Sequence, residues 1–121
     1  MSTVWIVDDD REIGRLLKTL FELENHRVLV FRTYQEVLPA LRQALPDVVL
    51  MDVLVQGRET IELVRQMRQE EGTAHVPVVM TSGMDCGQQC LDAGANLFVL
   101  KPFLPDELVK TVADLVGSSS D

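Results

Sequence analysis

Short apolar runs alternate with amphipathic stretches along the whole chain. Each run is rich in Val, Ile, Leu and Met, a composition typical of strands that are buried on both faces of a parallel sheet. We expect five strands, at residues 3–7, 27–31, 48–52, 77–81 and 97–100. Between them, apolar residues recur at three- and four-residue spacing, which predicts helices with one buried face. These helices are expected at about 12–24, within 34–44, at about 60–71, within 84–93 and at about 105–116.

This alternation of strand and helix predicts an α/β fold with a doubly wound parallel sheet. Pro39 lies inside the second helical stretch, so we expect that helix to be kinked or to start only at about Val37. Three glycines weaken the fourth helix, which we expect to be short or poorly ordered. They are Gly83, Gly87 and Gly94.

Length and charge limit the classes of protein to consider. The chain has 121 residues, 46% of them hydrophobic, as in an ordinary globular domain. We predict that residues 1–116 form this domain and that residues 117–121 are a flexible tail or the start of a linker. The formal net charge of −8 argues against nonspecific binding to nucleic acid or to anionic membranes. The chain has no apolar run of membrane-spanning length and no secretion signal, so we expect a cytoplasmic location.

Polar residues follow the predicted strands at the points where the strands end. Asp8 and Asp9 follow the first strand, and Asp52, Thr81 and Lys101 end the third, fourth and fifth. In an open α/β sheet, ligands bind at the carboxyl ends of the strands. The residues that converge there are those that would hold a divalent cation beside a phosphoryl group.

Each of these residues also has a simpler interpretation. Two adjacent acids repel each other unless a cation such as Mg²⁺ compensates, but Asp8 and Asp9 could also be solvated loop residues. Asp52 could be a nucleophile that forms an acyl phosphate, a third metal ligand, or only the acid that ends a strand. Thr81 could donate its hydroxyl to a phosphoryl oxygen or bond to local backbone, and Lys101 could bind a phosphate or a carboxylate.

Three further residues have local interpretations. Asp10 precedes the first helix and is predicted to be its N-cap. Cys86 and Cys90 lie four residues apart, which suits a redox pair or half of a metal site. We interpret them instead as two small, partly buried side chains, because no His lies near them and the short zinc spacing is missing.

Taken together, the motifs resemble the response-regulator receiver domain of two-component signalling, a CheY-like domain. The resemblance spans about residues 3–116 and implies a (βα)5 flavodoxin-like fold with a five-stranded sheet of order 2-1-3-4-5. The motifs that carry it are Val7-Asp8-Asp9-Asp10, Val49-Leu50-Met51-Asp52, Gly57, Thr81-Ser82-Gly83, Ala93-Gly94-Ala95 and Lys101-Pro102-Phe103.

The resemblance implies that the chain is a phosphorelay protein rather than an enzyme in the usual sense. Asp52 would accept a phosphoryl group from a histidine kinase or phosphotransfer protein. Asp8, Asp9 and Asp52 would bind Mg²⁺, and the backbone carbonyl of Leu54 would add a ligand.

It also implies a switch and further partners. Thr81 would bind the phosphoryl group and move with it, and Lys101 would pair with the phosphoryl group or the free aspartate. Phe98 would turn inward as a second switch residue, although without a hydroxyl it could equally be a plain core aromatic. The Lys101–Pro102 peptide would be cis. The switch would control an output domain or an effector protein, and the domain could act as a homodimer. No direct binding to nucleic acid or membrane is expected.

The chain departs from the family pattern after two of the strands. The family usually has Pro where Gln56 stands and Asp-Gly where Glu59 and Thr60 stand, so we expect a more mobile loop after Asp52. Ser82 replaces the Ala that is common in the family, and this small residue should leave the phosphoryl group accessible.

Two other functions remain as alternatives. In a small phosphohydrolase of the haloacid dehalogenase type, Asp8 and Asp10 would be the paired acids, but Asp52 would have no role and Glu12 stands where Thr or Val is expected. In a receiver-like scaffold, the chain would bind a partner without phosphorylation.

Overall fold

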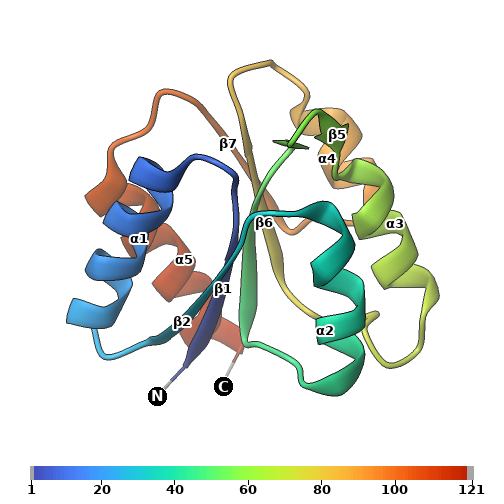
Figure 1. The fold of residues 1–121 in the computed structure, drawn as a ribbon, viewed down its shortest axis with the longest axis horizontal. Coiled ribbons are helices and arrows are strands. Elements are labelled where there is room, and N and C mark those ends of the chain that lie inside the picture. Colours follow the sequence, from blue (N-terminus) through green and yellow to red (C-terminus); the bar gives the residue numbers. More distant parts are fainter. Residues whose placement is uncertain (1, 120–121) are drawn as a thin grey trace.

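The computed structural model describes residues 2–119 and contains a five-stranded parallel sheet between two layers of helices (Figure 1). The sheet order β2-β1-β3-β6-β7 confirms the expected order 2-1-3-4-5. The strands are β1 (Thr3–Val7), β2 (Arg27–Phe31), β3 (Val48–Asp52), β6 (Val78–Ser82) and β7 (Leu97–Leu100). The predicted strand bounds are therefore correct in four cases and one residue early for β6.

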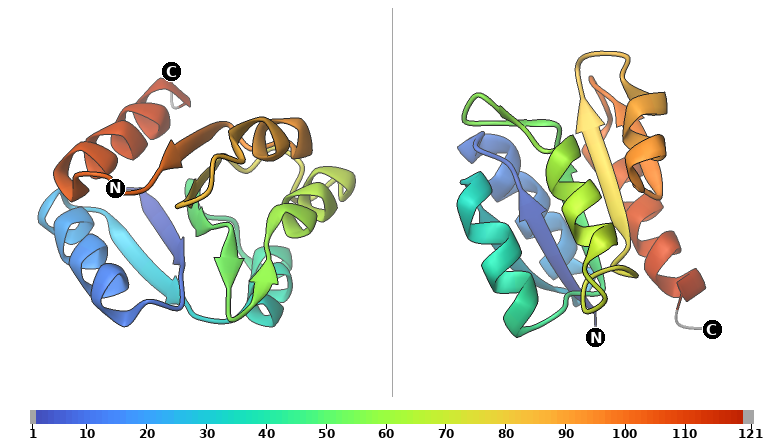
Figure 2. Two further views of the ribbon diagram at one scale, coloured as in Figure 1. Left: turned by 90° about the horizontal axis from the view of Figure 1, so that it is seen from above. Right: turned by 90° about the vertical axis from the view of Figure 1, so that its right-hand side faces the viewer.

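Helices cover both faces of the sheet, as the views from above and from the side show (Figure 2). The helical segments are α1 (Arg11–Leu23), η1 (Tyr34–Glu36), α2 (Val37–Gln43), α3 (Ile61–Gln69), α4 (Gly87–Ala93) and α5 (Pro105–Ser119). Helices α1 and α5 lie on one face, and α2, α3 and α4 lie on the other (Figure 1).

Alternation along the strands divides the hydrophobic core in two. On β1, Val4 and Ile6 pack toward α1 and α5, while Trp5 and Val7 pack toward α2, α3 and α4. All four side chains are buried, because β1 is an inner strand with helices over both of its faces. The apolar runs in the sequence are the direct result.

The predicted irregularities in the helices are confirmed. Helix α2 begins at Val37, which places Pro39 in the first turn, where a missing N–H is not needed for an intrahelical bond. Helix α4 is short and ends at Gly94, whose φ of 117° closes the helix.

The C-terminal helix is longer than expected, because α5 continues to Ser119 instead of ending near residue 116. The last two residues of the predicted tail lie outside the described part of the chain. Residues 1–116 as the limits of the domain stay a prediction. Within residues 2–119, no helix is long and apolar enough to cross a membrane.

A hairpin follows Asp52, where the sequence predicted a mobile loop without strands. Strands β4 (Leu54–Val55) and β5 (Arg58–Glu59) pair antiparallel. Gln56 and Gly57, with φ of 50° and 78°, form the turn between them. Two successive positive φ values give the backbone twist that suits a tight hairpin, and Gly57 adopts its value without steric cost.

Candidate functional site

The sheet order brings three acids together. Strands β1 and β3 are neighbours in the centre of the sheet, so the residues at their carboxyl ends meet at one edge. One carboxylate oxygen from each of Asp8, Asp9 and Asp52 lies within 4.8 Å of the others. Three such oxygens at this spacing suit a hard divalent cation.

Asp8 is the buried member of this acidic triad, with only 5% of its surface exposed. Its Oδ1 accepts a hydrogen bond from the backbone N–H of Asp10 at 2.9 Å. Burial raises the pKa of Asp8, and the charge of Asp52 raises it further, while the Asp10 N–H and Lys101 act in the opposite direction. The charge of the Asp8 carboxylate is therefore only partly compensated, and a bound cation would supply the rest.

Asp9 is exposed and connects the triad to the hairpin. Its Oδ2 accepts a hydrogen bond from the backbone N–H of Gln56 at 2.8 Å. The neighbouring Asp10 has the predicted capping role, because its Oδ1 accepts the N–H groups of Glu12 and Ile13 at 3.0 and 3.3 Å. Its carboxylate thus serves α1, and Asp52, not Asp10, completes the triad with Asp8 and Asp9.

Asp52 pairs with Lys101. The Lys101 Nζ lies 3.1 Å from Asp52 Oδ2, and both side chains are partly shielded from solvent. The Lys101 backbone N–H donates to the Ser82 carbonyl at 2.8 Å, and the Lys101–Pro102 peptide is cis, as the resemblance implied. The Lys101 ammonium group, which follows the carboxyl end of β7, is therefore held against the triad.

Thr81 stands beside Asp52 on the neighbouring strand. The two residues are partners in the β3–β6 register, and Thr81 is 4% exposed. The hydroxyl of the next residue, Ser82, accepts a hydrogen bond from the backbone N–H of Met84 at 3.0 Å, so a local backbone bond of the kind considered for Thr81 is made by Ser82.

The remaining two predicted site residues lie at the margins of the site. Leu54 is in β4, and its side chain is 46% exposed. Phe98 is half-buried in β7, next to the start of α4. A Cβ placed on Gly87 would lie 3.0 Å from Phe98 Cδ2, so the absence of a side chain at position 87 makes room for this ring.

Thr60 is a site residue that the sequence did not identify. Its side chain is fully buried, and its Oγ1 donates to the Asp52 carbonyl at 2.7 Å and to the Val53 carbonyl at 3.3 Å. The only sequence signal was Thr at a position where the family usually has Gly. Burial of this hydroxyl under the end of β3 depends on the hairpin, which was not predicted.

The two cysteines are free thiols, Cys86 directly before α4 and Cys90 within it. Cys90 is buried, and desolvation together with its neighbour Cys86 raises the pKa of Cys90 to about 12. A buried thiol with a raised pKa is a poor nucleophile and metal ligand. This supports the packing interpretation of the pair.

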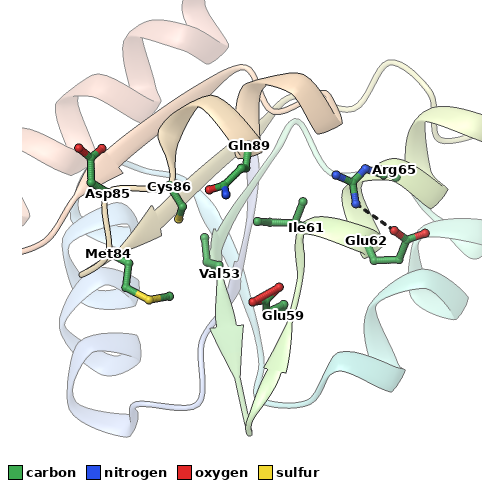
Figure 3. Close-up of a pocket in the computed structure, with 9 residues that line it drawn as sticks. All are labelled: Val53, Glu59, Ile61, Glu62, Arg65, Met84, Asp85, Cys86 and Gln89. Atoms are coloured by element: carbon green, nitrogen blue, oxygen red, sulfur yellow. Dashed lines mark hydrogen bonds and ion pairs between the residues drawn. The ribbon is translucent and has the colours of Figure 1, made fainter.

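A groove of about 620 Å³ lies next to the site, between α3 and the start of α4 (Figure 3). It reaches the site through Val53, which follows Asp52, and through Met84 on the loop after β6. None of the acids of the triad lines this groove. The triad itself is open to solvent through the exposed Asp9.

The sequence of this chain is similar to those of response regulators. The response regulator receiver domain family matches residues 4–113. The phosphate regulon transcriptional regulatory protein PhoB of Pseudomonas aeruginosa is 31% identical over 111 residues, which are 89% of this chain and 48% of that protein. The chain spans between 16% and 52% of the length of the first curated relatives it matches.

Solved structures match over nearly the full chain. A response regulator from Thermotoga maritima has 29% identity and a TM-score of 0.83, and the match covers 97% of this chain and 98% of that one. The receiver domain of a sensor histidine kinase from Pseudomonas aeruginosa PAO1 has 20% identity and a TM-score of 0.84, with 96% and 98% covered. That second protein has a magnesium ion coordinated in its active site cleft.

Proposed function

Because the chain belongs to the response regulator receiver domain family, which acts in phosphorylation-dependent signalling, we propose that Asp52 is its phosphoacceptor. A histidine kinase is the partner that this family implies, and the domain is a signalling module, not a conventional enzyme. One observation carries the proposal. Asp52 lies with Asp8 and Asp9 around one potential cation site and pairs with Lys101 at 3.1 Å.

The same cluster supports a magnesium site. The proposed ligands are the carboxylates of Asp8, Asp9 and Asp52 and the backbone carbonyl of Leu54. Oxygen ligands of this kind suit Mg²⁺, and the incompletely compensated charge of the buried Asp8 favours a cation there. When bound, Mg²⁺ would offset the negative charge of the phosphoryl group during transfer.

The chain's own residues account for the transfer step. A carboxylate oxygen of Asp52 forms a bond to phosphorus while the bond from phosphorus to the donor histidine nitrogen breaks, which gives an aspartyl phosphate. Lys101, which pairs with Asp52 in the free protein, then pairs with a phosphoryl oxygen. Thr81, the strand neighbour of Asp52, donates its hydroxyl to another phosphoryl oxygen.

The switch follows from the new bond to Thr81. As Thr81 moves toward the phosphoryl group, the loop between β6 and α4 moves with it, and Phe98, whose ring lies against Gly87 in the free protein, turns further inward. Two conformations that differ by a few kcal/mol are enough for a covalent modification to shift the population.

The surface that changes on phosphorylation then acts on an output domain or a separate effector protein. One such mode of action is the formation of a homodimer. Direct contact with nucleic acid is not part of this function, because the net charge of −8 repels phosphate backbones. The proposed location is the cytoplasm. The proposed receiver unit comprises residues 1–116. Residues 117–121, the first three of which continue α5, are proposed to be a tail or the start of a linker.

The test is the intact mass of the protein after incubation with acetyl phosphate and Mg²⁺. We expect one phosphoryl adduct on the wild type and none on Asp52→Ala. Asp114→Ala, which removes an exposed carboxylate on α5, is the matched control and should be labelled like the wild type. Labelling that persists in Asp52→Ala would show that another residue is the acceptor. A wild type that takes up no phosphoryl group would favour the scaffold function.

A further inference from the structure

The buried side chain of Val55 anchors the β4–β5 hairpin in the hydrophobic core. Three further contacts join the hairpin and the adjoining Thr60 to the rest of the molecule. The Gln56 N–H donates to Asp9 Oδ2 at 2.8 Å. The Thr60 hydroxyl donates to the Asp52 carbonyl at 2.7 Å. At the third point, the guanidinium carbon of Arg58 lies 3.8 Å from the centre of the Tyr34 ring, in η1. Two of these attachments end on acids of the triad.

Figure 3 shows the hairpin beside the groove: Val53 precedes its first strand, and Glu59 lies on its second. The turn between the strands is unfavourable for this sequence, because Gln56 has a φ of 50° and non-glycine residues rarely adopt positive φ. Such a conformation persists only where the surroundings hold it. The stacking of Arg58 on Tyr34 comes directly after the turn and is placed to hold it.

We propose that Arg58 and Tyr34 are positioning residues for the metal site, which they preorganise by holding the hairpin so that the Gln56 N–H fixes the Asp9 carboxylate. The inference rests on the proposed function in one respect, namely that the acidic triad binds Mg²⁺. Neither residue touches the metal. Their effect passes through the turn, with one oxygen of Asp9 bonded to Gln56 and the other left for the cation.

Charge alone predicts the opposite effect for Arg58. Arg58 is a cation on an element bonded to an acidic metal site, so its removal would strengthen binding of Mg²⁺ if only long-range electrostatics mattered. If Arg58 positions the turn, its removal weakens binding. Tyr34 separates the two effects further, because replacing its ring changes no charge.

The experiment is calorimetric titration of the unphosphorylated protein with MgCl₂. We expect Tyr34→Leu and Arg58→Ala each to weaken Mg²⁺ binding by about two- to fivefold, the range that an exposed cation–π contact supports. Tyr34→Phe keeps the ring and should bind like the wild type. The double variant should be no weaker than either single one, because both changes remove the same contact.

Two measurements guard against a general structural effect. Arg65→Ala removes an exposed arginine of α3 whose ion pair is with Glu62, outside the hairpin. This variant should change Mg²⁺ affinity only by the small amount expected from the loss of one charge. Hydrogen exchange of the Gln56 amide should be faster in Tyr34→Leu than in Tyr34→Phe, while exchange in the β1 and β3 amides stays the same.

The outcomes separate this inference from the proposed function. Unchanged Mg²⁺ affinity in Tyr34→Leu, tighter binding in Arg58→Ala, or additive losses in the double variant would overturn the positioning role and leave the receiver function standing. A wild type that does not bind Mg²⁺ would instead contradict the proposed metal site itself.

Discussion

The three acids of the triad differ in their surroundings more than their sequence positions suggest. Asp8 is buried, Asp9 is exposed, and Asp52 is intermediate and paired with Lys101. The burial of Asp8 leaves its charge only partly compensated in the metal-free protein. A buried carboxylate of this kind favours the binding of a cation, but it lowers the stability of the folded protein when no cation is bound.

Asp8→Asn should therefore stabilise the metal-free protein at pH 7, because it removes a desolvated charge beside Asp52. We expect a higher urea midpoint for the variant in EDTA, and we expect Mg²⁺ to raise the midpoint of the wild type but not of the variant. Asp114→Asn, on the exposed face of α5, is the control and should change neither value.

The pH dependence has a definite sign. The pKa of Asp8 in the folded protein is raised above the ordinary value of 3.8, so the folded state takes up a proton before the unfolded state does as the pH falls. At pH values above the pKa that Asp8 has in the folded protein, ionised Asp8 therefore destabilises the folded state. This destabilisation decreases as the pH falls toward 3.8. The stability advantage of Asp8→Asn should narrow in the same range, and an advantage independent of pH would contradict this explanation.

At the scale of elements, the hairpin and the end of β3 act as one unit. Thr60 joins them, since its backbone N–H donates to the Val53 carbonyl at 2.7 Å and its hydroxyl donates to the Asp52 carbonyl. The bond lies on the backbone of the proposed acceptor itself. Its loss would loosen the peptide that orients the Asp52 side chain.

Thr60→Val keeps the shape of the side chain and removes this hydroxyl. We expect a loss of about 1–2 kcal/mol in the free energy of unfolding, the usual effect of an unpaired buried carbonyl, and weaker Mg²⁺ binding. Thr73→Val is a matched control, because the Thr73 hydroxyl is also buried and donates to the Met67 carbonyl at 2.7 Å, away from the triad. Both variants should be destabilised, but only Thr60→Val should lose Mg²⁺ affinity; equal affinities would assign Thr60 a purely structural role.

At the scale of the whole molecule, the sheet order decides where charge gathers. The three acids lie at the ends of two central strands, and Lys101 lies at the end of an edge strand. The chain as a whole is also acidic, with a net charge of −8, and this charge opposes the compact state. Screening by any salt should reduce this repulsion, and a cation bound at the triad should reduce it by a different amount.

Binding to the folded state alone raises stability by RT ln(1 + [Mg²⁺]/Kd), or about 2.7 kcal/mol at one hundred times Kd. We expect MgCl₂ to raise the free energy of unfolding more than NaCl does at the same ionic strength. The difference should vanish in Asp9→Asn, measured by urea denaturation. Equal effects of the two salts on the wild type would mean that general screening, not a site, accounts for the stabilisation.

Much of this protein follows from its sequence. Strand positions, the parallel sheet and the delayed start of α2 are local consequences of apolar runs and of Pro39, and local patterns can be read directly. The convergence of the three acids was also predictable, since residues at the carboxyl ends of neighbouring parallel strands meet at one edge. The family motifs added the sheet order and the cis peptide.

Only the tertiary structure decided which side chains are buried and what they bond to. The hairpin, the Thr60 bonds and the stacking of Arg58 on Tyr34 join segments that carry no common pattern. Arg68 is a further case, because it donates to the Gly94 and Ala74 carbonyls and to Asn96 Oδ1, so that it joins α3 to the segments around β6 and β7. The physical reason is that periodicity encodes which face of an element is apolar, whereas burial and pairing depend on which elements come to lie against that face.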